Sequence, residues 1–348
     1  TYTVTVDTIA GDGTLGLDIA GGNDIIDTAG NAVNTTPTTD EVYNIDNTVP
    51  TASITRDDTN PTNADTVVFS VDFSEDVTNV TAADFTLALS GVTANATVTV
   101  GNAGDADDST YTVTVDTIAG DGTLGLDIAG GNDNTDTAGN GVNTTPTTDE
   151  VYTIDNTVPT ASITRDDANP TNADTVVFSV DFSEDVTNVT AADFTLALSG
   201  VTANATVTVG NAGDADASTY TVTVDTIAGD GTLGLDIAGG NDIVDTAGNA
   251  VNTTPTTDEV YNIDNTVPTV SITRDDTNPT NADTVVFSVD FSEDVTNVTA
   301  ADFPLARSGV TANATVTVGN AGDADASTYT VTVDTIAGDG TLGLDIAG

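Results

Sequence analysis

One segment of thirteen residues recurs along the chain at a constant spacing. The sequence Thr-Tyr-Thr-Val-Thr-Val-Asp-Thr-Ile-Ala-Gly-Asp-Gly begins at Thr1, Thr110, Thr219 and Thr328, so successive copies start 109 residues apart. Repeats of this kind form arrays in which each unit contacts its neighbours. An enzyme needs one assembled site, whereas a stalk or a multivalent binder gains from copies. The repeat therefore predicts a structural or adhesive protein and not an enzyme, with no catalytic residues.

The period also predicts where the domains begin and end. The sequence Asp-Asn-Thr-Val-Pro occurs at 46–50, 155–159 and 264–268, and a proline-containing linker of this kind favours a boundary before a new strand. The 348 residues are three periods plus 21, so we expect the sequence to be a window on a longer array. We predict a partial repeat at 1–47 (the C-terminal part of a unit), whole repeats at 48–156 and 157–265, and a partial repeat at 266–348 (the N-terminal part).

Within a repeat, the hydrophobic pattern is that of β-strands. Val67, Phe69, Val71 and Phe73 occupy every second position of one segment, as expected for a strand with one buried face. Clusters of Gly, Asn, Asp and Pro separate this segment from six others with similar alternation. The pattern predicts an all-β chain of tandem seven-stranded antiparallel immunoglobulin-like β-sandwiches. The seven strands are expected at 52–54, 67–73, 85–89, 94–100, 111–115, 124–128 and 152–154.

The strand number has a consequence for the shape of the array. An odd number of up-and-down strands places the entry and the exit of a repeat at opposite poles, so the repeats should form a linear rod. Strands rise about 3.3 Å per residue, which with loops at both poles implies on the order of 40 Å of length per repeat.

The charge of the chain restricts its partners. Asp and Glu number 55 against 4 Lys and Arg, giving a formal net charge of -51. Nucleic acids and anionic lipids are bound through Lys and Arg, so we expect no nucleic-acid partner. No apolar run approaches the roughly 18 residues of a membrane span, so we expect no direct membrane insertion in this segment. Without His, Cys or Lys, the usual general bases and nucleophiles are missing as well.

The acidic residues have two possible roles. They keep a long repetitive chain soluble and prevent association of identical neighbours, and they attract divalent cations. Strand parity brings the loop after the first strand, a tight turn and the exit linker of one repeat to the junction. There they meet the loop after the second strand of the next repeat and two further loops, with Asp214 and Asp216 and with Asp242 and Asp245. Calcium takes six to eight oxygen ligands, so we predict calcium at the junctions, the alternative being that these acids are only hydrated. Not all of the candidate ligands can belong to one site: Asp57, Asp58, Asp121, Asp155, Asn156, Asp166, Asp167, Glu184, Asp185, Asp264, Asn265, Glu293 and Asp294.

Several motifs resemble those of a known family. The segment 73–85 reads Phe-Ser-Glu-Asp-Val-Thr-Asn-Val-Thr-Ala-Ala-Asp-Phe, and 136–140 and 152–159 read Asp-Thr-Ala-Gly-Asn and Tyr-Thr-Ile-Asp-Asn-Thr-Val-Pro. Together they resemble the bacterial immunoglobulin-like repeats of very large secreted surface proteins and adhesins, and the resemblance covers every repeat. It implies an extracellular or cell-surface stalk, with calcium-stiffened junctions as in related adhesins. The acidity and the absence of Lys depart from the family.

Two non-catalytic functions are therefore predicted. In the first, the repeats are the passive extender of a giant surface adhesin, stiffened by calcium, and their partners are the neighbouring repeats of the same chain. In the second, they are the self-assembling subunit of an extracellular filament, sheath or surface layer, and other copies of the protein are partners as well. Separately, Arg56 and its counterparts Arg165 and Arg274 are expected to form local salt bridges with the acidic pairs that follow them.

Overall fold

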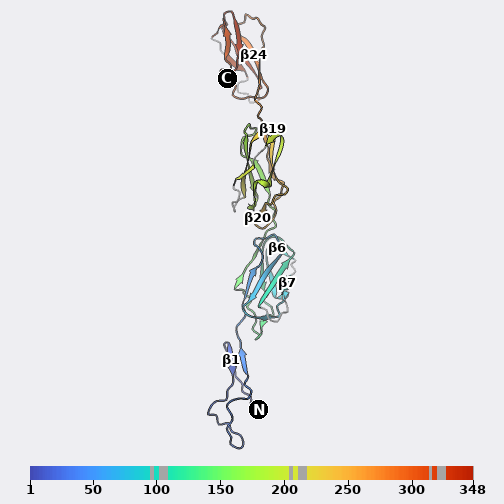
Figure 1. The fold of residues 1–348 in the computed structure, drawn as a ribbon, viewed down its shortest axis with the longest axis vertical. Coiled ribbons are helices and arrows are strands. Elements are labelled where there is room, and N and C mark those ends of the chain that lie inside the picture. Colours follow the sequence, from blue (N-terminus) through green and yellow to red (C-terminus); the bar gives the residue numbers. More distant parts are fainter. Residues whose placement is uncertain are drawn as a thin grey trace.

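The structure is a computed structural model of the chain that describes residues 1–94, 98–101, 109–203, 207–210, 218–312, 316–319 and 327–347. Part of the predicted strand at 94–100 and the loop with Asp214 and Asp216 lie outside these residues. Regular structure in the described residues consists of β-strands and three short 3-10 helices, η1 (Ala82–Asp84), η2 (Ala191–Asp193) and η3 (Ala300–Asp302). The repeated sheets follow one another along the long axis of the molecule (Figure 1). The predicted fold class, all-β with tandem β-sandwiches, is confirmed.

The first whole repeat consists mainly of two sheets. The larger sheet has five strands in the order β11-β3-β4-β8-β7, and the smaller one has three in the order β12-β9-β6. A short pairing of β5 with β10 lies beside them. The strands are β3 (Ala52–Arg56), β4 (Thr66–Phe73), β5 (Val77–Thr78), β6 (Phe85–Ala94), β7 (Val98–Gly101), β8 (Thr110–Asp116), β9 (Ile118–Ile128), β10 (Thr135–Asp136), β11 (Thr148–Asp149) and β12 (Tyr152–Ile154).

The second whole repeat has the same arrangement of strands. Its sheets have the orders β17-β18-β14-β13-β21 and β16-β19-β22, and β15 pairs with β20. The strands are β13 (Ala161–Arg165), β14 (Thr175–Phe182), β15 (Val186–Thr187), β16 (Phe194–Ala203), β17 (Val207–Gly210), β18 (Thr219–Asp225), β19 (Ile227–Ile237), β20 (Val244–Asp245), β21 (Thr257–Asp258) and β22 (Tyr261–Ile263).

Each strand predicted in the first whole repeat has a counterpart in the structure. They are β3, β4, β6, β7, β8, β9 and β12. The alternation did not indicate β5, β10 and β11, because a strand of two residues is too short to show a period. The pairing of β11 with β3 is parallel, a local exception to the antiparallel sheets.

The core of each whole repeat lies between its two sheets. Val67, Phe69 and Val71 on β4 are fully buried, because every second side chain of a strand points to the same face. Leu124 on β9 belongs to the same buried cluster, and the ring of Tyr152 on β12 meets Phe69 edge-on, with ring centroids 5.0 Å apart. Burying one such side chain contributes about 1.5–3 kcal/mol. The apolar side chains at these alternate positions therefore pack against each other and hold the two sheets together.

The first 47 residues are far more exposed than the whole repeats. Their strands β1 (Gly13–Gly16) and β2 (Val42–Ile45) pair with each other. Tyr43 on β2 is 75% exposed, whereas its counterparts Tyr152 and Tyr261 are fully buried. The ring of Tyr152 packs against Phe69 of its own repeat, whereas Tyr43 has no such ring contact among the described residues.

The last segment has a smaller core of its own. Phe287, Val289, Phe303 and Tyr329 are buried together. None of the helices in the described residues has the length and hydropathy that a bilayer crossing requires. The strands of this segment are β23 (Val270–Arg274), β24 (Val285–Phe291), β25 (Leu305–Ser308), β26 (Thr311–Ala312), β27 (Val316–Gly319), β28 (Thr328–Val333), β29 (Ile336–Ala337) and β30 (Thr341–Leu344).

Candidate metal centre at the repeat junctions

Three carboxylates meet at the junction between the two whole repeats. Asp155 lies in the linker after β12, Glu184 in the loop between β14 and β15, and Asp245 on β20. One oxygen of each lies within 4.8 Å of the others. We call this cluster the second triad. Figure 1 places β20 at the end of its repeat that faces the preceding one.

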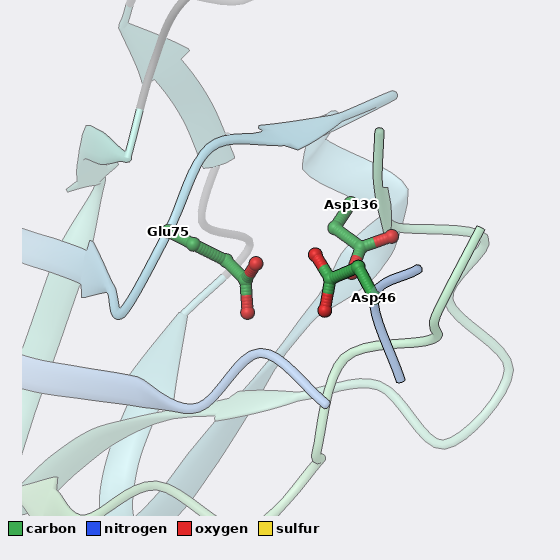
Figure 2. A group of neighbouring side chains, drawn as sticks. All are labelled: Asp46, Glu75 and Asp136. Carbon is green, nitrogen blue, oxygen red and sulfur yellow. The ribbon is translucent and has the colours of Figure 1, made fainter. Parts of the chain in front are cut away.

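The same cluster recurs one period earlier in the chain. Asp46, Glu75 and Asp136 form the first triad, again with one oxygen of each within 4.8 Å of the others. Figure 2 shows the three side chains gathered in one space, with Asp46 contributed by the linker and the other two by the repeat that follows it. Each triad therefore joins a linker to the repeat that the linker enters.

The loop after β20 holds the Asp245 carboxylate through several hydrogen bonds. Its Oδ1 accepts hydrogen bonds from the backbone N–H groups of Ala247 (2.8 Å), Gly248 (2.7 Å) and Asn249 (2.8 Å), and its Oδ2 accepts one from the Asn249 side chain (2.8 Å). The loop turns at Gly248, whose φ of 100° suits glycine. Asp245 is only 3% exposed, and these donors hold a buried carboxylate in one orientation.

The pKa of Asp136, the counterpart of Asp245, reflects this environment. Burial acts to raise the pKa, but the hydrogen bonds from the side chain and backbone of Asn140 and from the backbone of Gly139 and Ala138 outweigh it. The pKa of Asp136 is therefore held below its ordinary value, because these donors stabilise the charged form.

The linker is tied to both of the repeats that it joins. The Asn156 N–H donates to Oδ1 of Asp121 (2.6 Å), and its side chain donates to the Gly120 carbonyl (2.7 Å), both in the preceding repeat. The Asp155 carbonyl accepts from the Asn249 side chain in the following repeat (2.8 Å). These hydrogen bonds hold Asp155 next to the other two carboxylates without using its carboxylate group. Its Oδ1 accepts a hydrogen bond from the Thr157 N–H (3.0 Å).

Glu184 differs from its two neighbours. In the part of the chain that the structure describes, no group donates a hydrogen bond to its carboxylate and no cation pairs with it. Burial raises the pKa of Glu184, and the charges of nearby carboxylates raise it further; these are Asp155, Asp245, Asp121 and Asp185.

The glutamates at the equivalent positions are in similar surroundings. Burial raises the pKa of Glu75, and negative neighbours, with Asp46 and Asp136 among them, act in the same direction. In the last repeat, Oε1 of Glu293 is buried and has no hydrogen-bond partner among the residues that the structure describes. A carboxylate partly removed from water among like charges is a place where a bound cation would lower the electrostatic energy.

The donor set fits a hard cation. Each triad offers carboxylate oxygens and no nitrogen or sulfur ligand, and the chain has neither His nor Cys. Oxygen ligands of this kind suit Ca²⁺ or Mg²⁺ and not the softer transition metals. The two acidic triads, each with one buried member, could therefore bind metal ions.

The structure separates the predicted ligands into groups. Asp155 and Glu184 belong to the second triad, and Asp264 and Glu293 are their counterparts one period later. Asp121 and Asp185 lie outside the triad but close enough for their charges to act on Glu184. Asn156 and its counterpart Asn265 bond to the preceding repeat through Gly120 and Gly229, and Asp294 is the counterpart of Asp185.

The acidic pairs after the first strand lie outside both triads. Asp57 accepts a hydrogen bond from the Ser70 hydroxyl (2.8 Å), and Asp58 accepts one from the Val68 N–H (2.8 Å). The backbone N–H groups of both residues donate to the Tyr152 hydroxyl. Asp166 and Asp167 make the same contacts with Ser179 and Val177.

The ligands predicted from the sequence did not include four members of the triads. Asp46 and Glu75 lie 109 residues before Asp155 and Glu184, so the period alone could have indicated them. Asp136 and its counterpart Asp245 belong to a recurrent Asp-Thr-Ala-Gly-Asn segment, and strand parity placed the loop with Asp245 at the junction. Only the structure shows that both carboxylates are buried beside a linker.

The expected salt bridge of Arg56 forms with a different partner. Its Nε lies 3.5 Å from Oε2 of Glu150, and its Nη1 donates to the Val151 carbonyl (2.9 Å). Arg165 pairs in the same way with Glu259. The prediction of the acidic pair that follows Arg56 was wrong, because Asp57 and Asp58 are engaged with β4.

Among known proteins, the chain is similar in structure to a bacterial adhesin. No family model matches the sequence, and no curated protein matches it. Among solved structures, the chain is similar to one of FdeC, described as a broadly conserved Escherichia coli adhesin that elicits protection against urinary tract infections. The TM-score is 0.40 and the identity 14%, over 85% of this chain and 92% of that one.

Proposed function

We propose that these repeats form a non-catalytic stalk of a giant extracellular surface adhesin, and that calcium at the junctions stiffens it. The observation that carries the proposal is the position of the triads. In each one, Asp46 or Asp155 comes from the linker and the other two carboxylates from the next repeat. An ion bound there would therefore join two segments whose relative motion bends the rod.

Electrostatics gives the direction of the effect. Without an ion, three carboxylates whose oxygens lie within 4.8 Å of one another repel. That repulsion is relieved when the linker moves away from the repeat, which loosens the junction. A divalent cation reverses the sign of the interaction and favours the closed arrangement. We propose Ca²⁺ in preference to Mg²⁺ because Ca²⁺ accepts variable arrangements of oxygen ligands. Extracellular protein modules also bind Ca²⁺ at the calcium concentrations found outside cells.

The remaining features of the chain agree with a surface stalk. The formal net charge of -51 opposes binding to nucleic acids and anionic lipids. The repeats follow one another along a line (Figure 1), the shape that an extender needs. The absence of Lys, His and Cys from the sequence leaves few groups for acid–base or nucleophilic chemistry.

The test compares the whole chain in millimolar calcium and in excess chelator at constant ionic strength. We expect calcium to raise the melting temperature and to lengthen the particle measured by small-angle X-ray scattering. An ion at 100 times its Kd stabilises the bound state by about 2.7 kcal/mol. The double variant Glu75→Gln and Glu184→Gln should lose both responses.

A matched control removes the same charge elsewhere. The double variant Asp57→Asn and Asp166→Asn changes two acids outside the triads and should keep both calcium responses. Identical melting and scattering of the unmodified chain with and without calcium would rule out calcium-stiffened junctions. Growth into long particles with rising protein concentration would instead identify the subunit of a filament, sheath or surface layer.

A further inference from the structure

Successive repeats also touch through a contact that does not involve the linker. Asn63, in the loop between β3 and β4, donates from its backbone N–H to the Ala247 carbonyl (3.2 Å). Its Nδ2 donates to Oδ1 of Asn249 (3.1 Å). Both acceptors lie in the loop after β20 of the next repeat, the loop that holds Asp245. The preceding repeat is therefore in contact with the residues that position the second triad.

Asn249 connects three segments of the junction. Its Nδ2 donates to Oδ2 of Asp245 (2.8 Å) and to the linker carbonyl of Asp155 (2.8 Å), and its Oδ1 accepts from Asn63. A hydrogen bond accepted by one end of an amide polarises it and strengthens the bonds that it donates. The contact with Asn63 thus acts on the two bonds that keep Asp155 and Asp245 together.

Residues 1–47 do not include a counterpart of Asn63, so the first triad lacks this contact in the chain described. At the first triad, Asn140 donates to the Asp46 carbonyl over 3.1 Å, and no described residue donates to its Oδ1. Asn140 is half-buried, whereas Asn249 is only 8% exposed, and Ala247 is buried while its counterpart Ala138 is exposed. The two triads therefore share their carboxylates and differ in this contact.

We infer that docking of Asn63 on the loop of Asn249 increases the ion affinity of the second triad, so that ion binding and the placement of the preceding repeat are coupled. The inference rests on the proposed function. Holding Asp155 in place before the ion arrives removes part of the ordering that binding would otherwise require. Coupling is reciprocal, so the ion must favour the docked arrangement of the two repeats by the same factor.

The experiment measures each triad separately in the full chain. Glu184→Gln leaves the first triad intact, and Glu75→Gln leaves the second, so calorimetric titration with calcium chloride gives one affinity for each. We expect the second triad to bind calcium more tightly by about fivefold, a factor typical of modest coupling between sites. Asn63→Ala in the Glu75→Gln chain should reduce that affinity to the level of the first triad.

Three controls separate this effect from a loss of structure. Asn172 is the exposed counterpart of Asn63 and has no hydrogen bond in the described part of the chain, so Asn172→Ala should leave the second triad unchanged. Asn63→Ala in the Glu184→Gln chain should leave the first triad unchanged. Melting in chelator should not change, and if Asn63→Ala disturbs the loop, Asn63→Ser tests the same contact with a residue suited to turns.

The outcomes distinguish the inference from the function on which it rests. Calcium binding at both triads with affinities that Asn63→Ala does not change would overturn the coupling and leave the calcium-stiffened stalk intact. Absence of binding at both triads would overturn the calcium proposal and the coupling together. A loss of affinity at the first triad as well would show that Asn63→Ala acts through general instability, and that result also overturns the inference.

Discussion

The two whole repeats are nearly identical in sequence. At one buried position the first repeat has an amide side chain and the second has an apolar one. They share strand order and pairing, and the apolar residues of their two core clusters match position by position, apart from Ile243, whose counterpart is Asn134. Only six of 109 positions differ: Thr59 and Ala168, Asp108 and Ala217, Asn134 and Ile243, Thr135 and Val244, Gly141 and Ala250, and Thr153 and Asn262.

Position 134 carries the largest physical difference of the six. Asn134 is 1% exposed, and no described residue forms a hydrogen bond with its Oδ1 or its Nδ2. Ile243 at the same place is fully buried in the core of the second repeat. The backbone contact is the same in both, since Val142 N–H donates to the Asn134 carbonyl as Val251 N–H donates to that of Ile243. The shared residues therefore determine the fold, and the buried amide lowers only its stability.

Exchanging these two residues should produce the largest effect. Ile243→Asn removes about 1.5–3 kcal/mol of apolar burial and leaves an amide without partners, which costs about 1–3 kcal/mol more. We expect the second repeat to lose roughly 3–5 kcal/mol. The reverse change, Asn134→Ile, should stabilise the first repeat by about 1–3 kcal/mol. Denaturant unfolding in chelator measures both changes.

A neighbouring position provides the control for the exchange. Thr135 is replaced by Val244 in the second repeat, and both side chains are half-buried. Thr135→Val should change the free energy of unfolding by less than Asn134→Ile, because this position already has partial access to solvent. Equal stability of Asn134→Ile and the unmodified chain would contradict the comparison, and would mean that water satisfies the Asn134 amide in solution.

The second prediction concerns the pH dependence of the two triads in chelator. Burial raises the pKa of Glu75 and Glu184 above the ordinary value of 4.5, so the folded chain binds a proton more tightly than the unfolded one. Their contribution to stability is therefore complete below pH 4.5 and is lost as the pH rises through the raised pKa. The lowered pKa of Asp136 has the opposite effect. Its contribution to stability is present above pH 3.8, the ordinary pKa, and is lost as the pH falls through the lowered pKa.

The variants Glu75→Gln and Glu184→Gln test this sign. In chelator at neutral pH we expect each to stabilise its junction by no more than about 1 kcal/mol, because solvent screens these partly exposed groups. The melting temperature of each variant should also vary less between pH 4.5 and 7. With calcium present the order should reverse, and the unmodified chain should melt higher. A variant that melts lower than the unmodified chain in chelator would show that the glutamate has a stabilising partner.

The sequence was sufficient for the fold and for part of the candidate site. Val67, Phe69 and Val71 occupy alternate positions, which predicted a strand with one buried face, because every second side chain of a strand points to the same side. All three residues are fully buried. Parity brought the linker Asp155 and the loop Glu184 to one junction, as the structure does. The role of Asn249 could not be predicted, because the hydrogen bonds that link it to Asn63 and to Asp155 join segments far apart in the sequence.

The smallest expected effect concerns an Arg–Glu ion pair that should contribute equally to the stability of the two repeats. The Nε to Oε2 distance is 3.5 Å between Arg56 and Glu150 and 3.6 Å between Arg165 and Glu259, with the same exposure in both pairs. Partly exposed ion pairs contribute about 0.2–1 kcal/mol, so Arg56→Ala and Arg165→Ala should each destabilise by that amount and by equal amounts. Added salt should reduce both losses, because it screens the ion pair. The six substitutions lie outside these pairs, so unequal losses would mean that a difference such as Asn134 alters more of its repeat than its own surroundings.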